Sequence, residues 1–235
     1  MMSTLVSAQP INDLQNRLQS MRNDQKTRIE VEVEFRHRGS APLHLNKEKR
    51  RGVAVVEAGP KGVRKITSKW LGSSTRFSAW GGKKNENEEA LLDDAEALDL
   101  VNPAGMMETF LREATLLSDE KVTWQGQPAR LLVVRPALLD GKKAAKNKNK
   151  DEDEPKAYAI EAKVWLDENG VPLAMERDFE LRFGPALSVT ESQSFTFQQV
   201  EGRLLVAEVE ETWSGTGLGV LRGRDDKKLK VVAVH

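Results

Sequence analysis

The most regular pattern of apolar and polar positions lies between Tyr158 and Phe183, where two alternating stretches flank an Asn-Gly pair. Every second position in each stretch is apolar, except at Arg177. Asn169-Gly170 tolerates positive φ at both central positions of a tight turn, so we predict a β-hairpin with one apolar face. The apolar positions are Tyr158, Ile160, Ala162, Val164, Leu166, Val171, Leu173, Met175, Phe179, Leu181 and Phe183.

The N-terminal third combines a helical pattern with a strand pattern. Pro10 is suited to the first turn of a helix, and apolar residues recur on one helical face until about residue 24. From Thr27 to His37 the chain then alternates strictly, which predicts a half-buried strand. The helical positions are Ile11, Leu14, Leu18 and Met21, and the strand positions are Ile29, Val31, Val33 and Phe35.

The middle of the chain changes period, because Asn87 to Leu100 is acidic and has apolar residues at helical spacing. Asn102-Pro103 then reads as an N-cap and first-turn pair for a second helix. Its apolar stripe consists of Met107, Phe110, Leu111, Ala114 and Leu117. Additional strands are predicted at 51–57, 63–68, 75–80, 121–125, 129–135, 189–200, 203–213 and 229–234.

The predicted fold class is mainly β (α+β), a single curved antiparallel sheet or half-open β-barrel covered by an N-terminal helix and two mid-chain helices. Gln125-Gly126 and Glu201-Gly202 mark tight connections between consecutive strands, which favours a meander. Residues 9–235 would form this one domain, with a flexible, highly charged insertion at 140–156.

Composition excludes several classes of protein. Lys+Arg and Asp+Glu both total 36, so no global field favours nucleic acid. Cysteine is absent, and no apolar run is long enough to span a bilayer. Residues 1–8 resemble the end of a signal peptide, since small residues precede Gln9-Pro10, and on that basis we expect export to the periplasm.

No catalytic constellation stands out. His37 and His44 lie seven residues apart but lack further ligands at suitable spacing, so we predict neither a metal site nor a cofactor. The carboxylate pairs Glu208/Glu210 and Asp178/Glu180 are interpreted as solvent-facing strand positions rather than as the acids of a glycosidase. The protein is therefore expected not to be an enzyme.

Arg177 interrupts the apolar stripe of the second hairpin strand. A buried guanidinium is costly unless it is paired. Three interpretations remain open for Arg177: an exposed strand end, an ion pair with an inner carboxylate, or a polar anchor for a ligand headgroup.

Two segments carry a resemblance to a known family, VWLDENGVPLAMER at Val164–Arg177 and KVTWQGQPARLLVV at Lys121–Val134. With the order of elements, they resemble the outer-membrane lipoprotein carrier (Lol-type) family and its periplasmic half-barrel relatives. The resemblance implies a half-open barrel, closed by helices, whose apolar interior holds acyl chains. The residues that would bind such a ligand are Ile29, Val31, Val33, Phe35, Met107, Phe110, Leu111, Leu173, Met175, Arg177, Phe179 and Leu181.

The functional hypothesis is a non-enzymatic periplasmic carrier or binding protein for lipid, lipoprotein acyl chains or another apolar ligand. Its partners would be a lipid or an acylated protein, an envelope protein, and membrane complexes contacted peripherally, with no nucleic acid. The alternative is an envelope protein-interaction or sensor module with a filled core, since fold alone does not fix function.

Overall fold

The computed structural model describes residues 9–23, 25–41, 44–76, 91–136, 156–183, 187–217 and 221–235. Within these ranges the chain forms three helices and ten strands. The helices are α1 (Gln9–Ser20), α2 (Asp94–Val101) and α3 (Pro103–Leu111). The strands are β1 (Thr27–Ala41), β2 (His44–Gly59), β3 (Gly62–Arg76), β4 (Thr115–Trp124), β5 (Gln127–Arg135), β6 (Lys156–Leu166), β7 (Pro172–Phe183), β8 (Leu187–Val200), β9 (Arg203–Gly217) and β10 (Leu221–Val234).

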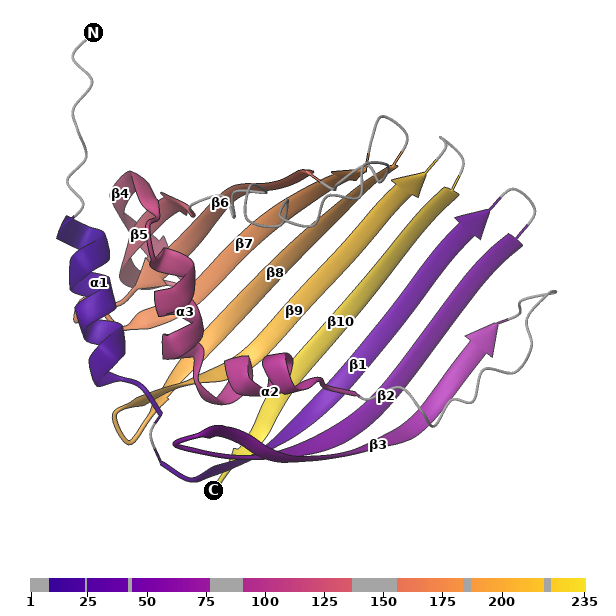
Figure 1. The fold of residues 1–235 in the computed structure, drawn as a ribbon, viewed down its shortest axis with the longest axis horizontal. Helices are drawn as coiled ribbons and strands as arrows, with labels where there is room; N and C mark the ends of the chain where they lie inside the picture. Colours follow the sequence, from indigo (N-terminus) through magenta and orange to yellow (C-terminus); the bar gives the residue numbers. More distant parts are fainter. Residues whose placement is uncertain are drawn as a thin grey trace, which may run out of the picture.

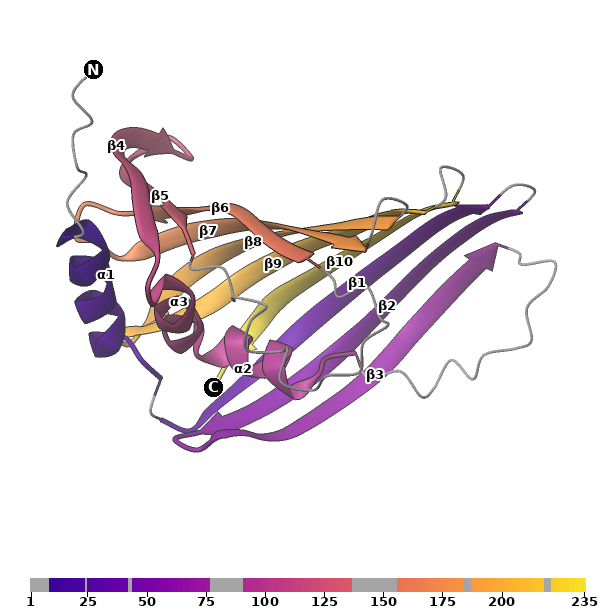
Figure 2. The ribbon, with the colours of Figure 1, turned by 45° about the horizontal axis from the view of Figure 1, so that its top comes forward.

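All ten strands belong to one antiparallel sheet in the order β3-β2-β1-β10-β9-β8-β7-β6-β5-β4. Neighbouring strands in the sheet are consecutive in the chain, with one exception. β1 pairs with β10, so that the first strand of the chain lies beside the last. The sheet curves but does not close, and the three helices lie on its concave side near one end of the strands (Figures 1 and 2). The predicted fold class is therefore confirmed, as a curved open sheet with helices on one face.

The hairpin turns differ from each other in backbone conformation. Gln125-Gly126 and Glu201-Gly202 have positive φ at both residues, as a two-residue hairpin requires. Gly170 has φ +75°, whereas Asn169 does not have a positive φ, so the predicted conformation of Asn169-Gly170 is wrong. The Asp167 carboxylate shapes this turn instead, because its Oδ1 accepts hydrogen bonds from the backbone N–H groups of Asn169 and Val171, at 2.8 and 2.7 Å.

The two mid-chain helices are shorter than their apolar stripes indicated. Asn102 caps α3 through a hydrogen bond from Gly105 N, as predicted, but α3 ends at Leu111. Glu113 adopts φ +63° and the chain then enters β4, so Ala114 and Leu117 are not helical. Leu116 pairs with Val134 and enters the core from the strand, which explains why a helical spacing was misleading here.

Several strands extend beyond their predicted ends. β1, β2 and β10 continue through charged and glycine-containing segments that lack apolar alternation, yet their residues pair along the full length. β3 covers both the predicted strand at 63–68 and the first residues of the one at 75–80. The remaining part of that second prediction lies outside the described residues, as do residues 1–8 and nearly all of the insertion at 140–156.

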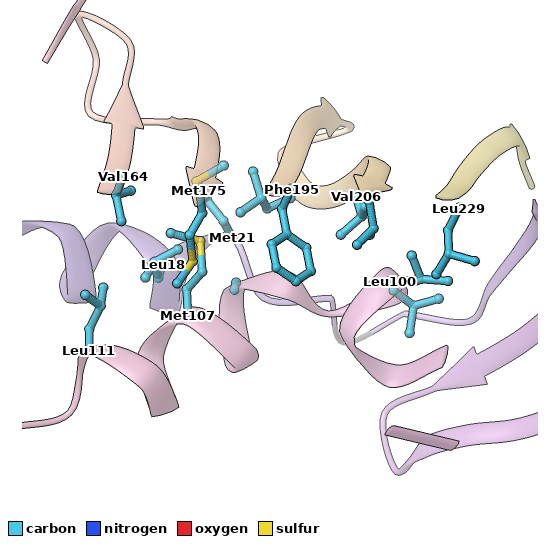
Figure 3. Packing of buried hydrophobic residues seen from close by; sticks show 14 of the residues in the cluster. Leu18, Met21, Leu100, Met107, Leu111, Val164, Met175, Phe195, Val206 and Leu229 are labelled. Carbon is cyan, nitrogen blue, oxygen red and sulfur yellow. The ribbon is translucent and has the colours of Figure 1, made fainter. Parts of the chain in front are cut away.

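The hydrophobic core lies between the concave face and the helices (Figure 3). Leu18 of α1, Leu100 of α2 and Met107 of α3 are at most 2% exposed and face strand residues. Each fully buried side chain of this kind contributes about 1.5–3 kcal/mol relative to an exposed position. Helix packing on the sheet therefore stabilises helices of 8 to 12 residues that would be marginal alone. No helix among the described residues has the length and apolar character needed to cross a bilayer.

Candidate functional site

Strand register divides the concave face into successive rows of side chains. The first row, called the apolar row, runs through directly paired residues of eight neighbouring strands. Its members are Gly52, Val33, Leu229, Val209, Phe195, Met175, Val164 and Leu132. None of the seven side chains is more than 6% exposed. The helices thus cover a continuous apolar surface that crosses most of the sheet.

The next row lies two residues along each strand and therefore points to the same side. It is called the charged row, because four of its members carry a charge. From β2 to β5 its members are Arg50, Phe35, Lys227, Glu211, Gln193, Arg177, Ala162 and Val134. One step further, the outer row contains Glu48, His37, Asp225, Trp213, Glu191 and Phe179.

Gly52 allows the segment before α2 to approach the sheet closely. A Cβ atom at this position would lie 2.7 Å from Leu91 Cδ1 and 2.9 Å from the Lys69 carbonyl oxygen. Leu91 itself is 2% exposed and belongs to the core. Leu91 therefore occupies the space that a side chain at position 52 would need, and it covers the β2 end of the apolar row.

Arg177 lies where the apolar and charged rows meet. Its guanidinium stands over the rings of Phe195 and Phe179, at 5.0 and 5.6 Å from their centroids. Nε donates to Gln193 Oε1, and Nη1 lies 3.8 Å from the sulfur of Met106 on α3. Among the described residues no carboxylate is within ion-pair distance of Arg177.

Burial is the main influence on the pKa of the Arg177 guanidinium, which it lowers, while the carboxylates of Asp99, Glu191 and Glu211 act in the opposite direction. These carboxylates stabilise the cation through space rather than by contact. Arg177 is thus an inward cation beside α3 that retains capacity for a direct anionic partner. Of the three interpretations made from sequence, the exposed strand end is wrong, and among the described residues the ion pair with an inner carboxylate is wrong as well.

Two inward carboxyl groups lie on the neighbouring strands. Burial, a hydrogen bond with Glu211 and the charge of Glu211 raise the pKa of Glu191 to about 7. Glu211 Oε1 also accepts hydrogen bonds from Trp213 Nε1 at 2.7 Å and from Gln193 Nε2 at 2.8 Å. The two carboxyl groups, Gln193 and Trp213 therefore form one hydrogen-bonded cluster beside Arg177.

The remaining charged side chains on this face are paired. Lys227 contacts Glu96 of α2, and this ion pair connects the helix directly to the charged row. His37 contacts Asp225, and Arg50 contacts Glu48 while standing 5.5 Å from the ring centre of Trp70. Burial raises the pKa of Asp99 on α2, although the Arg177 charge counteracts it. The charged row thus places ion-paired side chains beside α2.

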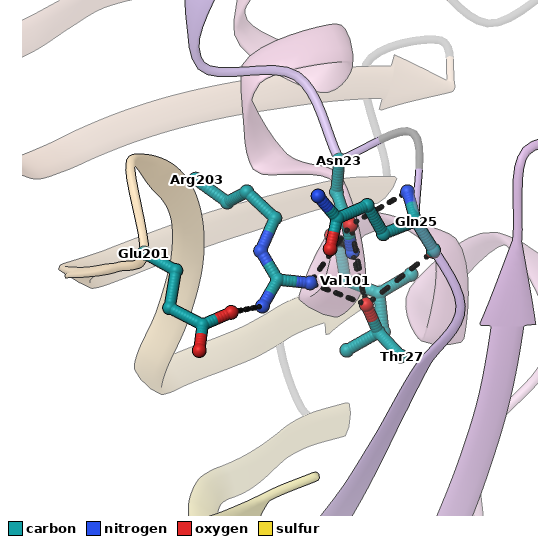
Figure 4. A network of polar contacts seen from close by, with 6 residues as sticks. All are labelled: Asn23, Gln25, Thr27, Val101, Glu201 and Arg203. Carbon is teal, nitrogen blue, oxygen red and sulfur yellow. Dashed lines mark hydrogen bonds and ion pairs between the residues drawn. The ribbon is translucent and has the colours of Figure 1, made fainter.

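A separate polar network fixes the end of the helical cover (Figure 4). Asn23 Nδ2 donates to the Val101 carbonyl at the end of α2, at 3.0 Å, and to Thr27 Oγ1. Arg203 donates to Thr27 Oγ1 at 3.1 Å and pairs with Glu201 at 2.8 Å. A backbone bond from Leu204 N to Met21 O supports the same junction. The network joins α2, the start of β1 and the β8–β9 turn.

The structure brings most of the sequence-predicted site residues to the concave face. Ile29, Val31, Val33, Met107, Leu111 and Met175 are buried in the core, and Phe110 packs against it. Phe35, Phe179 and Arg177 are half-buried in the charged and outer rows. Leu173 falls at a bulge between β6 and β7 and stays outside the core cluster. The side chain of Leu181 lies outside the described residues.

The polar partners of Arg177 were not predicted from the sequence. Glu191 and Gln193 share the parity of Phe195 on β8, and Glu211 shares that of Val209 on β9. Polar residues at strand positions that face the concave side could have indicated these partners. The strand register that brings them together across three strands cannot be derived from the sequence. Glu208 and Glu210 point to the convex face, where Lys228 Nζ binds both at 2.7 and 2.8 Å.

Comparison with solved structures returns chains that align over most of this chain at low sequence identity. A domain of an outer membrane lipoprotein-sorting protein from Vibrio parahaemolyticus aligns with 14% identity and a TM-score of 0.36, covering 96% of this chain and 91% of that one. A LolA superfamily protein from Nitrosomonas europaea aligns with 9% identity and a TM-score of 0.31, covering 97% and 94%. A DUF1329 family protein from Desulfovibrio piger aligns with 9% identity and a TM-score of 0.33, covering 96% and 93%.

Two of these solved structures bear names from the lipoprotein-sorting family that the sequence segments resemble. No family model matches the sequence, and no curated protein matches it either.

Proposed function

We propose that the protein is a non-enzymatic periplasmic carrier or binding protein for lipid, lipoprotein acyl chains or another apolar ligand. The ligand would lie between the concave face of the sheet and the three helices, within one half-barrel domain formed by residues 9–235. The observation that carries the proposal is the apolar row, which eight strands contribute and which short helices cover.

The way the helices are attached supports this proposal. Their contacts with the sheet are mainly between apolar side chains, which have no directional requirement. In the described part of the chain, the one backbone hydrogen bond between the region following α1 and the sheet is that of Leu204 with Met21. Movement of α2 and α3 away from the strands would break the contacts of Glu96 with Lys227, of Val101 with Asn23 and of Met106 with Arg177. An apolar guest would then take the place of the helix side chains against the sheet.

Methionine is concentrated where the guest would lie. Met107 on α3 and Met175 on β7 are both fully buried, and Met21 follows α1 at the same core (Figure 3). Unbranched thioether side chains adapt to irregular shapes at low cost. An interior of this kind suits acyl chains of variable length better than one built from β-branched residues alone.

Arg177 would bind the polar end of the ligand. It adjoins the apolar row, is oriented by Gln193, and has no ion pair among the described residues. A carboxylate or phosphate would supply the charge-assisted hydrogen bonds that this guanidinium lacks. An anionic amphiphile is therefore the ligand class that the geometry favours.

A second function is favoured by one specific observation, the complete burial of the apolar row beneath the helices. Val33, Met175 and Phe195 are at most 3% exposed, so the helices already fill the space that the strands leave. A protein-interaction or sensor module with a filled core would look the same. The two functions differ in whether an apolar molecule enters the core.

Native mass spectrometry of the protein purified without detergent separates the two functions. The carrier hypothesis predicts a stoichiometric adduct, either co-purified or formed when a fatty acid or phospholipid is offered. Arg177→Met should weaken uptake of an anionic lipid, whereas the matched change Lys163→Met at an exposed position of β6 should not. If the protein shows only its ligand-free mass under all these conditions, the filled-core module is favoured.

A further inference from the structure

The convex face of β1, β2, β3 and β10 carries a dense group of basic side chains. On β1 the concave positions Val31 and Val33 are buried, so Arg36 and Arg38, of opposite parity, point to the convex side. The same reasoning applies to the neighbouring strands through their register. We name this group the basic surface, and it consists of Arg36, Arg38, Lys47, Lys49, Arg51, Lys69 and Arg224.

Like charges face each other directly within the basic surface. Arg36 pairs in register with Lys49, and Arg38 pairs with both Lys47 and Arg224. Directly opposed like charges on neighbouring strands destabilise a sheet. The arrangement therefore costs folding free energy, and an anion bound outside the sheet would compensate for it.

Few carboxylates neutralise the basic surface. Glu34 lies 2.9 Å from Arg51 and 3.4 Å from Arg36, and Asp226 lies 2.8 Å from Arg224. The other four basic side chains have no ion pair with any described residue, namely Arg38, Lys47, Lys49 and Lys69. Exposed Glu32, opposite Val53 in register, is a third carboxylate on the same side. Seven cations against three carboxylates leave a formal charge of +4 on this surface, although the whole chain has a formal charge of zero.

Exposed apolar side chains lie beside these cations. Leu71 is 63% exposed at a bulge of β3, and Val53 is 37% exposed opposite Lys69. Basic residues with interspersed apolar ones are typical of surfaces that bind the interface of an anionic bilayer, where cations meet headgroups and apolar groups insert between them. A nucleic-acid backbone would satisfy the cations but would leave Leu71 and Val53 exposed to water.

We propose that the basic surface docks the protein onto the surface of a bilayer that contains anionic phospholipid. The cations come from four adjacent strands and thus form a two-dimensional array, which matches a layer of headgroups better than it matches a linear polyanion. The site lies on the convex face, opposite the face to which a carried ligand is assigned. It does not depend on the proposed carrier function.

Vesicle co-sedimentation tests the docking. The protein should sediment with vesicles of phosphatidylcholine and phosphatidylglycerol, but not with phosphatidylcholine alone, and added salt should release it. The double variant Lys47→Glu/Lys49→Glu should lower the apparent affinity by about tenfold or more, because each basic residue contributes to attraction at the surface. The matched variant Lys26→Glu/Lys121→Glu changes two exposed lysines elsewhere and should bind as the unmodified protein does.

Leu71→Ser should lower the affinity less than the charge reversal does, and thermal unfolding should show that all variants are folded. Equal binding to neutral vesicles, or equal loss in both double variants, would overturn the proposal. So would displacement from the vesicles by duplex DNA at equal phosphate concentration. Native mass spectrometry should show that Lys47→Glu/Lys49→Glu takes up an apolar ligand to the same extent as the unmodified protein does. Loss of vesicle binding can then be told apart from a failure of the carrier hypothesis.

Discussion

The apolar row and the charged row lie two residues apart on the same strands, yet only the second carries charged side chains, which lie on β2, β10, β9 and β7. Val33 and Leu229 are buried under helices, whereas their neighbours in the next row, Phe35 and Lys227, are half-buried at the border of α2. The strands are equally regular in both rows. The difference therefore arises from the helices that cover the sheet. Strand residues beneath the helices are buried and are therefore apolar. At the border of the helices, ion pairs such as Lys227–Glu96 become favourable.

This comparison also shows how a ligand would be oriented. The apolar row offers no hydrogen-bonding side chain, while the charged row presents Arg177 beside Gln193 and Glu211, with Glu191 next to them in the outer row. An amphiphile between sheet and helices would place its chain along the first row and its headgroup at the second. Substitutions confined to one row or the other can therefore separate the two contributions.

The largest effect is expected in the apolar core. Met107→Ala removes a fully buried side chain of α3 and should lower the free energy of unfolding by about 2–5 kcal/mol, through lost burial and a residual cavity. Urea denaturation measures the change. The control Val232→Ala, at a residue that is 50% exposed, should alter stability by less than about 0.5 kcal/mol. Equal effects at both positions would contradict the packing of α3 on the sheet.

A second prediction tests how tightly the β2 end of the apolar row is sealed. Gly52→Ala would place a Cβ within 3 Å of Leu91 and of the Lys69 carbonyl, which should cost about 1–3 kcal/mol of stability. Gly72→Ala in the adjacent strand meets nothing within 4 Å and serves as the matched control. Similar thermal midpoints for the two variants would show that Leu91 does not pack against Gly52.

The carboxyl groups around Arg177 should make stability depend on pH. The pKa of Glu191 is raised from 4.5 to about 7 in the folded state, so the folded protein retains a proton that the unfolded chain releases. Stability should therefore fall as the pH rises through this interval and level off above it. Glu191→Gln should flatten the decline, and Glu176→Gln, at an exposed residue, should leave it unchanged. Denaturation curves between pH 4 and 8 measure both slopes.

Asp99 acts in the same direction, since burial raises its pKa, so the slope in Glu191→Gln should be reduced rather than abolished. A slope identical to that of the unmodified protein would show that Glu191 is not coupled to Glu211 and Arg177.

The smallest effect is expected on the convex face. Lys228→Ala removes ion pairs with Glu208 and Glu210 at the surface, and such exposed pairs contribute about 0–1 kcal/mol. Urea denaturation at low and at high salt should give nearly the same result for the variant and the unmodified protein. A loss comparable to that of Met107→Ala would mean that the convex face contributes to stability far more than its exposure indicates.

Local chemistry explains which parts of the fold were predictable. Strict alternation in β1 and β7 and the Asn102 cap indicated strands and helices correctly, because each signal lies within a few residues. The end of α3 was mispredicted because Ala114 and Leu117 continue a helical spacing by coincidence. The long ends of β1, β2 and β10 are stabilised by pairing with neighbours, which leaves no trace in hydropathy.

The candidate site was predictable only in its apolar half. Val31, Val33 and Met175 follow from strand parity, and Arg177 stood out because it breaks the pattern. Its partners Gln193, Glu191 and Glu211 required the register of β7, β8 and β9. The basic surface likewise depends on the alignment of β1 with β2 and β10, since parity and register decide which basic residues of these strands share the convex face.

The central claim is that an apolar chain enters between the concave face and the helices. Photolabelling with a diazirine fatty acid, followed by peptide mass spectrometry, tests it most directly. We predict label on peptides from α3 around Met107 and from β7 around Met175, which face each other in the core (Figure 3). Label that is absent from these peptides, or confined to convex strand positions, would contradict it.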